Sequence, residues 1–294
     1  ASAYLKCHYL AAFLAAMLNN QPMGFYHPAT LVKDAQRHGL RVRPADVMQS
    51  DWDCTVDTGK SLRMGLRYIR GLRQEAGLAI EAARRSAPFV SIDDLVQRVP
   101  ELRKDELRTL AKTGALNFIN DIRRRDAMWD SERARRPAGP LLSAVQQIEQ
   151  PSPLQQMTLK ERLHADFTGT GLTVGRHPMA YYRPEMEKRG VRTAMELHAL
   201  RDGQLVKIAG AVIVRQRPGT AHGFVFLSLE DETGVVNIII EPKTFDRNKE
   251  TFVRYPFLLI HGTLQNQQGA ISVKAGKVEA IDVNAIPVPS HDFH

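Results

Sequence analysis

The sequence predicts an α+β protein of more than one domain, with helices first and a β-rich region towards the C-terminal end. Three observations lead to this fold class. The chain has 294 residues, which is enough for two or three domains with cores of their own. A stretch rich in Pro, Gln and Ser at 137–153 interrupts the helical pattern and predicts a linker. From Gln204 onward, the residue pattern changes from that of helices to that of strands.

The composition narrows the class of partner. The formal net charge is +8 and the pI is near 9.6, which favours a polyanion such as nucleic acid. Cys7 and Cys54 are too few for a disulfide framework or a zinc site, and this predicts a reducing, cytoplasmic environment. No run of about 18 apolar residues occurs, so we expect no membrane helix. The start has neither Met nor the layout of a signal peptide, so we expect a fragment of something longer.

The first part of the chain is predicted to contain two helices and a hairpin. Apolar residues recur at helical spacing over 3–19, and a proline opens a second helix over 28–38. Two short extended runs, 52–56 and 62–66, flank a hairpin turn at 57–60.

Short helices joined by tight glycine turns follow from 69 to about 117. One helix is predicted over 74–85, and Ser91 provides a hydroxyl cap, with an acid three residues later, for the next. A further helix from Lys104 ends near Gly114. After a strongly basic segment and the linker, residues 158–200 are predicted to be helical around a glycine-containing loop.

The last part of the chain has the strand order of an OB barrel. Five strands with a helix between the third and the fourth are the arrangement of this fold. The predicted strands are 205–214, 223–230, 235–240, 257–264 and 270–275, with a helical piece near 243–253.

One candidate site for a DNA backbone is a pair of glycine turns. Helix-hairpin-helix units hold a phosphate with turn amides and the following helix N-terminus, where glycine permits close approach. The first turn is Ile69-Arg-Gly-Leu-Arg73, in which Arg73 replaces the second glycine of the pattern, and the second retains only Gly114. The residues expected to contact duplex phosphates are Arg70, Gly71, Arg73, Lys112 and Gly114. Both glycines could equally be ordinary helix ends.

A second candidate site is a basic loop between two strands. Arg215, Arg217 and His222 lie in or beside a segment bent by Pro and Gly, and Lys207 precedes it. Phe224 and Phe226 follow and share one face of a strand, where their rings could stack on bases. Alternatively, both rings fill the barrel core.

No residues in the chain form a convincing catalytic or metal site. Asp51 and Asp53 have the spacing of a metal-binding pair on a strand, but no third carboxylate is well placed. His164 and His177 bracket a glycine loop without metal-ligand spacing. The segment 156–160 has some likeness to clamp-binding peptides, but a helix start explains it better. We therefore expect no catalytic residue and no metal ligand in this span.

Five sequence strings are informative when taken together. They are Gln-Pro-Met-Gly-Phe-Tyr at 21–26, Lys-Thr-Gly-Ala-Leu at 112–116, Gly-Leu-Thr-Val-Gly-Arg-His-Pro at 171–178, Arg-Gln-Arg-Pro-Gly-Thr-Ala at 215–221 and Leu-Glu-Asp-Glu-Thr-Gly-Val-Val-Asn at 229–237. As a set, they resemble the error-prone branch of the bacterial C-family DNA polymerases, the damage-induced relatives of the replicative α subunit. The resemblance covers nearly the whole chain, although Leu10 and His222 depart from the usual residues of the family.

The resemblance implies a division of the chain into domains. Residues 1–60 would be the end of the polymerase fingers, 61–136 a tandem helix-hairpin-helix region and 137–200 a linker and helical connector. Residues 201–284 would be the OB-fold domain, followed by a tail at 285–294.

The resemblance also implies a role. The catalytic palm, with its Mg²⁺ ions, would lie upstream, and this span would grip primer–template duplex and single-stranded template during translesion synthesis. The sliding clamp and mutagenesis accessory proteins are further implied partners. Two alternatives stay open: a free-standing DNA-binding adaptor, and the C-terminal part of the replicative α subunit. The string at 21–26 argues against the second alternative.

Overall fold

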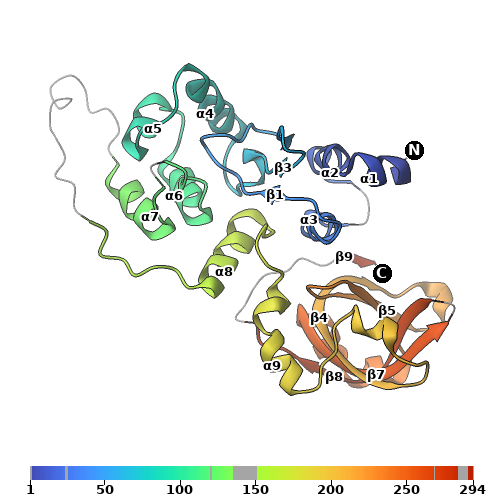
Figure 1. Cartoon of the computed structure of the whole chain (residues 1–294). Helices are drawn as coiled ribbons and strands as arrows, with labels where there is room; N and C mark the ends of the chain where they lie inside the picture. The colour runs from blue at the N-terminus through green and yellow to red at the C-terminus, as the bar shows by residue number, and fades with distance from the viewer. Residues whose placement is uncertain are drawn as a thin grey trace, which may run out of the picture. The chain divides into compact units, whose positions relative to one another are not determined.

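The computed structural model describes residues 2–23, 26–119, 121–134, 151–267 and 269–283, together with the backbone of 291–293. Most of the predicted linker and tail falls outside these ranges. The chain divides into two compact units, each discontinuous in sequence. Ala1–Pro22 and Gly39–Val174 form what we call the helical unit; Met23–His38 and Gly175–His294 form the barrel unit. Figure 1 shows the elements of both. The domain boundaries inferred from the resemblance stay predictions.

The helical unit begins with two helices where the sequence predicts one. α1 (Ser2–His8) and α2 (Leu10–Asn19) are separated by Tyr9, whose φ of −135° and ψ of 44° are not helical. α2 buries Leu14 and Leu18, whereas α1 buries no side chain. The single helix over 3–19 is therefore wrong at Tyr9.

A small sheet follows in the helical unit. β1 (Val42–Arg43), β2 (Thr55–Val56) and β3 (Leu62–Arg63) lie in the order β1-β3-β2, and β2 pairs antiparallel with β3. The amide of Lys60 donates to the carbonyl of Asp57 at 2.9 Å and closes the predicted turn. The hairpin is confirmed, but its strands are shorter than predicted.

Within its described residues, the helical unit is completed by five α-helices. They bury Ile80, Leu95 and Leu110 completely. Ser91 caps one of them, as predicted, by accepting a hydrogen bond from the amide of Asp94 at 3.0 Å. After η1 (Leu66–Tyr68), the helices are α4 (Gln74–Ser86), α5 (Ile92–Arg98), α6 (Lys104–Thr113), α7 (Arg124–Arg133) and α8 (Leu159–Thr170).

The barrel unit contains short helical elements and one curved sheet. Its helical elements are α3 (Pro28–Arg37), η3 (Pro178–Tyr181), α9 (Arg183–Lys188), η4 (Glu196–Ala199), η5 (Gly219–Ala221), α10 (Pro242–Arg247) and α11 (Lys249–Arg254). Its strands are β4 (Leu205–Gln216), β5 (Val225–Glu230), β6 (Val235–Ile240), β7 (Phe257–Gln267), β8 (Ala270–Ala280) and β9 (His291–Phe293).

The first five of these strands close into an OB-type barrel, which confirms the predicted fold class. They follow the order β5-β6-β8-β7-β4, and an additional β4–β5 pairing closes the ring. β6 and β8 run parallel, and α10 and α11 lie between the third and fourth strands in sequence. The barrel core contains alternate residues of each strand, including Val225, Leu227 and Leu229 of β5. This alternation determines which side chains remain outside.

No helix among the described residues is long and apolar enough to cross a membrane.

Candidate nucleic-acid interface

The first glycine turn of the helical unit has the predicted open geometry. Gly71 has a φ of +81° and is exposed, and nothing lies within 4 Å of the position where its Cβ would be. The amide of Leu72 donates to the carbonyl of Ile69 at 3.2 Å and closes the turn before α4. A left-handed residue is required here, and glycine adopts that conformation without steric cost. The backbone of this turn is therefore accessible to a ligand.

Arg73, by contrast, is bound within the helical unit. Its Nε donates to Oε1 of Glu106 at 3.0 Å, its Nη2 donates to Oε2 at 3.1 Å, and its amide donates to Oε1 at 2.9 Å. The same carboxylate accepts the amide of Arg103 at 2.7 Å. Glu106 thus holds the N-terminal ends of α4 and α6 together. An internal carboxylate occupies the place beside Arg73 where the sequence suggested a phosphate.

The charge of Glu106 is stabilised by this arrangement. Its side chain is buried, which disfavours the carboxylate, but the hydrogen bonds from Arg73 and Arg103 outweigh burial and lower the pKa of Glu106. The pairing joins residues 33 positions apart in sequence, so sequence reasoning missed it. The acid at the third position of a predicted helix was the available signal.

Arg70 also makes contacts within the helical unit. Its amide donates to the carbonyl of Gly169 at 2.7 Å, and its guanidinium donates to the carbonyl of Thr168 at 3.4 Å. These carbonyls belong to the last turn of α8, where a cation is favourably placed. Arg70 therefore links the first turn to α8 while its side chain stays exposed.

Gly114 is the left-handed end of α6, with a φ of +85°, and it is buried. A Cβ there would lie 2.6 Å from Nε of Arg124, so a side chain already covers this position. Lys112 is half-buried and, among the described residues, has no hydrogen-bond or ion-pair partner. Of this second set, only Lys112 is placed to reach a phosphate.

Two further segments repeat the sequence pattern of the first turn, and sequence reasoning missed both. Segments 99–103 and 119–123 each have an apolar residue, two intervening residues, a second apolar residue and an Arg that is the N-cap of a helix. The amide of Leu102 donates to the carbonyl of Val99 at 3.1 Å, as in the first turn. Asp121, with a φ of +51°, takes the place of the glycine. Arg123 is exposed and has no partner among the described residues.

The barrel unit places Phe224 and Phe226 outside its core. Val225, Leu227 and Leu229 point inward, Phe226 is half-buried on the opposite face of β5, and Phe224 is half-buried directly before this strand begins. The alternative that both rings fill the barrel core is therefore wrong. Phe226 lies opposite Ile239 of β6, which lies opposite Lys274 of β8. The second and third strands form the oligonucleotide-binding face of OB folds.

The predicted basic loop lies at the edge of this face, but its charges are used unequally. Arg215 donates to the carbonyls of Phe252 at 2.9 Å and Tyr255 at 3.1 Å, so it caps the end of α11. Arg217 is exposed, and its guanidinium lies 5.3 Å from the centre of the Phe245 ring. His222 is exposed in a left-handed conformation with a φ of +50°. Of the basic residues of this loop, Arg217 and His222 are therefore the exposed ones.

Lys207 lies apart from that loop, at the first half of β4. It is exposed, and its Nζ donates to the carbonyl of Arg189 at 3.1 Å. The register places it beside His261 of β7.

The structure does not make a metal site from Asp51 and Asp53. They lie in a bend before β2, so they do not share a strand face. Asp51 pairs with Arg84 at 2.7 Å, and Asp53 pairs with Arg67 at 2.7 Å. Over the residues that the structure describes, no three His, Cys, Asp or Glu side chains are grouped to hold a metal.

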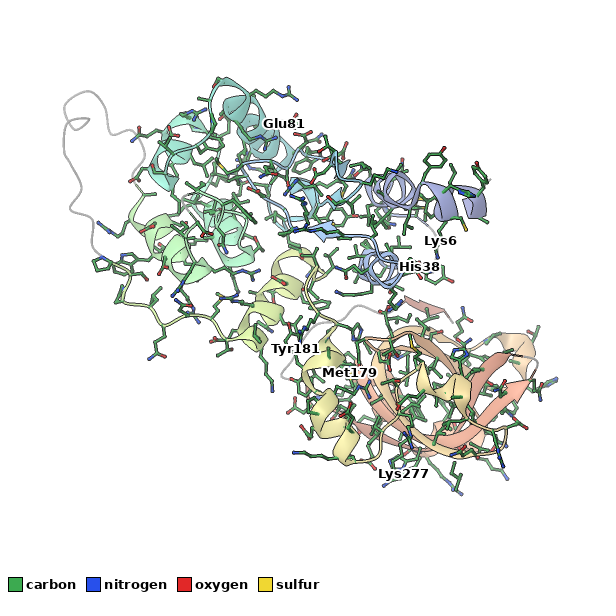
Figure 2. All side chains as sticks on the ribbon, viewed as in Figure 1. Lys6, His38, Glu81, Met179, Tyr181 and Lys277 are labelled. Atoms are coloured by element: carbon green, nitrogen blue, oxygen red, sulfur yellow. The ribbon has the colours of Figure 1, made fainter. Side chains whose placement is uncertain are left out.

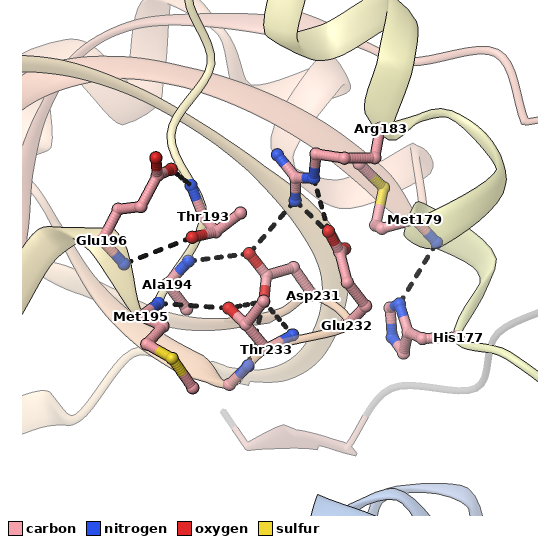
Figure 3. A network of polar contacts seen from close by, with 11 residues as sticks. His177, Met179, Arg183, Thr193, Ala194, Met195, Glu196, Asp231, Glu232 and Thr233 are labelled. Carbon is pink, nitrogen blue, oxygen red and sulfur yellow. Dashed lines mark hydrogen bonds and ion pairs between the residues drawn. The ribbon is translucent and has the colours of Figure 1, made fainter.

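A buried polar network joins the segment before the barrel, residues 183–196, to the turn between β5 and β6 at residues 231–234 (Figure 3). Asp231 accepts the amides of Ala194 at 2.8 Å, Thr233 at 2.7 Å and Gly234 at 2.9 Å. Arg183 pairs with Asp231 at 3.3 Å and also with Glu232. This turn at 231–234, which we call the acidic turn, is therefore held by internal contacts.

A second buried group joins α3 to the barrel. Nη1 of Arg37 lies 2.8 Å from Oε1 of Glu230, and Nζ of Lys33 donates to the carbonyl of Gly175 at 2.5 Å. Burial raises the pKa of Glu230 to about 7, against the opposing effect of Arg37. Burial likewise lowers the pKa of His177, whose Nε2 lies 3.9 Å from Glu230. His164 is an exposed residue of α8, in the other unit.

Two family models match the chain. One, described as a helix-hairpin-helix motif, matches residues 39–127. The other, described as an OB-fold nucleic acid binding domain, matches residues 206–281. They fall on the parts of the chain where the turn–helix repeats and the barrel lie.

The chain is also similar along its length to error-prone DNA polymerases. It is 39% identical to that of Methylococcus capsulatus over 316 residues, which cover 99% of this chain and 30% of the relative. It is 41% identical to that of Alkalilimnicola ehrlichii over 300 residues, or 100% of this chain and 29% of the relative. The chain thus spans less than a third of the length of these curated relatives.

Among solved structures, an asparaginyl-tRNA synthetase from Pyrococcus horikoshii matches 33% of this chain and 25% of its own, with 23% identity and a TM-score of 0.26. This similarity is too low to support an argument.

Proposed function

Because the chain is related along its whole length to error-prone DNA polymerases, we propose that it is the DNA-holding, non-catalytic part of such an enzyme. The complete enzyme would carry out template-directed nucleotidyl transfer with Mg²⁺ during damage-induced mutagenesis and translesion synthesis. The residues that hold the metal would lie in the part of the polymerase that this chain does not span. We place the enzyme in the cytoplasm, where the bacterial chromosome lies.

The observation that carries the proposal is the pair of aromatic rings outside the barrel core. A buried ring would stabilise the fold alone, whereas Phe226 lies half-buried on the face formed by the second and third strands, and Phe224 lies half-buried directly before the second strand. We propose that they stack on template bases, and that Arg217 and His222 contact the backbone of the same strand.

In the helical unit, we propose that duplex phosphates are held by the repeated turns. The groups available for this are the exposed backbone at Gly71, the exposed Arg123, and Lys112, whose side chain has no partner among the described residues. Three other predicted residues would support these turns without contacting DNA. The guanidinium groups of Arg70 and Arg73 bind groups of the protein, and Arg124 covers Gly114. Arg215 would likewise support the loop through α11.

Replacing Phe226 by Ala tests the stacking role. Each stacked base contributes about 1–3 kcal/mol, so the Kd for an oligothymidylate should rise about 5- to 150-fold. Fluorescence anisotropy measures this change. The control is Tyr255→Ala, which removes an exposed ring at the C-cap of α11, outside β5 and β6. Equal affinity of Phe226→Ala and the control would refute the stacking role.

Replacing Arg123 by Ala tests the duplex role. The slope of log K against log salt for duplex DNA should become about 0.9 less steep, since one phosphate contact is lost. Arg254→Ala is the control, because Arg254 is exposed but paired within its own helix to Glu250 at 3.1 Å. An unchanged slope would remove Arg123 from the interface.

A free-standing DNA-binding adaptor is the alternative that this chain itself could fulfil. Both functions require DNA binding, and neither gives this chain catalysis. A primer-extension assay on the purified chain should therefore show no nucleotide incorporation; synthesis would overturn the assignment. Pull-down with purified sliding clamp would test that proposed partner, and mutagenesis accessory proteins are tested in the same way.

A further inference from the structure

A basic groove lies on the outer face of the barrel, on strands other than the pair that carries Phe226. Its volume is about 730 Å³, and it is lined by residues of β4, β7 and β8, with contributions from the segment 190–192 and the start of α10. Its lining contains no Phe, Tyr or Trp. A ligand in this groove would therefore be recognised by charge and hydrogen bonds, with no aromatic stacking.

One row of side chains crosses the groove. Lys207 of β4 lies opposite His261 of β7, which lies opposite Lys277 of β8. Adjacent strands are about 4.8 Å apart, so the three side chains are neighbours on the same outward face. Both lysines are exposed, and Lys277 is labelled on the barrel in Figure 2. Three adjacent strands thus each present a nitrogen-bearing side chain to one ligand.

The floor beside this row is formed by glycine backbone. Gly262 is buried, and a Cβ there would collide with the carbonyl of Lys274 and lie 2.6 Å from Cγ1 of Val273. Gly276 is exposed and is the extra residue of a bulge, because His261 pairs with Lys277 and Gly262 pairs with Ala275. Gly262 is thus required by the close approach of β7 and β8, whereas glycine at 276 lets a ligand approach the backbone closely.

The groove keeps an excess of positive charge after internal pairing. Three carboxylates partly neutralise it: Glu241 pairs with Lys274, Glu196 with Arg192, and Glu279 with Lys277, Arg189 and His261. Lys207 donates only to the carbonyl of Arg189, so its charge faces no carboxylate among the described residues. Leaving His261 out, the three acids face five cations, an excess of two charges; the cations are Lys207, Lys274, Lys277, Arg189 and Arg192.

We propose that this groove binds consecutive phosphates of a single nucleic-acid strand after the strand leaves the face that carries Phe226. The inference rests on the proposed function and extends it. The register row from Phe226 through Ile239 reaches Lys274, which also lines the groove. A strand that stacks on Phe226 can therefore continue onto β8 and into the groove. Binding there is independent of base sequence.

The test removes two charges from the groove of the full chain. Lys207→Gln together with Lys277→Gln should weaken binding of an oligothymidylate of about 20 nucleotides by about 25-fold at about 0.1 M salt, because each phosphate contact gives a slope near 0.7 for single strands. The slope of log K against log salt should become about 1.4 less steep. The matched control is Lys249→Gln, an exposed lysine of α11 outside the groove. Circular dichroism melting checks that each variant folds.

Three outcomes are informative. If the double variant has the same slope of log K against log salt as the control, the groove does not bind phosphates. If Phe226→Ala still weakens binding in that case, the proposed function stands without the groove. Failure of the unaltered chain to bind the oligonucleotide overturns both. A poly-glutamate peptide is the second probe. If the groove variant no longer binds the peptide but binds the oligonucleotide as tightly as the native chain does, the groove is a site for an acidic peptide and the nucleic-acid assignment is wrong.

Discussion

Asp231→Ala should destabilise the barrel unit strongly. The carboxylate is buried and accepts three backbone amides, at 2.7 to 2.9 Å, besides its pairing with Arg183. Alanine would leave those amides without an acceptor and would leave a buried guanidinium with Glu232 alone. Hydrogen bonds to charged groups contribute about 1.5–3 kcal/mol each, and water entering the gap would recover part of the loss. We therefore expect a loss of about 3–5 kcal/mol.

Amide hydrogen exchange is the appropriate assay, because both tryptophans, Trp52 and Trp129, lie in the helical unit. Tryptophan fluorescence consequently reports on that unit alone. In Asp231→Ala, the slowest amides of β6 and β7 should exchange about 100- to 3,000-fold faster, since 1.4 kcal/mol corresponds to a factor of ten. The midpoint of the fluorescence transition in urea should stay where it is.

Asp202→Ala provides the control for this experiment. Asp202 accepts one exposed hydrogen bond, from the amide of Asn266 at 2.8 Å, so its loss should cost at most about 1 kcal/mol. If exchange in Asp231→Ala matched that of Asp202→Ala, the claim that the acidic turn holds the preceding segment on the barrel would fail.

Four further substitutions are expected to have defined effects on stability. Burial raises the pKa of Glu230 from 4.5 to about 7, so the folded state favours the protonated acid and the free energy of unfolding falls as pH rises from about 4.5 to 7. Relative to the native chain, the free energy of unfolding of Glu230→Gln should rise by about 3 kcal/mol by pH 8, and a difference that stays constant between pH 4 and 8 would contradict this. The pKa of Glu106 is lowered instead, so the stability that its carboxylate contributes is present at neutral pH and is lost in acid. Glu106→Gln should therefore lower the urea midpoint of unfolding at pH 7, and the midpoints of variant and native chain should approach each other below about pH 4.5. Equal midpoints at pH 7 would argue against the role of Glu106 in linking α4 and α6. Gly262→Ala places a Cβ against the carbonyl of Lys274 and should cost about 1–3 kcal/mol, whereas Gly276→Ala, whose Cβ would lie 3.5 Å from the carbonyl of His261, should melt within a few degrees of the native chain.

The barrel could be predicted from sequence because its signals are local. Alternation in β5 separates Val225, Leu227 and Leu229 from Phe224 and Phe226. The same alternation left the direction of the rings undecided, since either face of a strand can be the inner one until the partner strands are known. Pairing with β6 and closure by β4 determine which face is buried.

The charged residues of the site were harder to predict for a different reason. Arginines at 73, 70 and 215 have the composition of a phosphate site, yet their partners are a carboxylate and carbonyl groups distant in sequence. An ion pair across 33 residues leaves no periodic signal. The turns at 99–103 and 119–123 do leave one, but it appears as an apolar–apolar–Arg repeat without glycine.

The discontinuity of the barrel unit has a consequence for how the protein is made. Lys33 of α3 donates to the carbonyl of Gly175, which lies 142 residues later in the sequence. α3 therefore leaves the ribosome long before any barrel strand has been synthesised. During synthesis, the first unit whose whole chain becomes available is the helical one, and α3 must wait within it as an unpaired insert. A polypeptide cut to begin at Gly175 would contain β4 to β8 and yet bury Glu230 without Arg37.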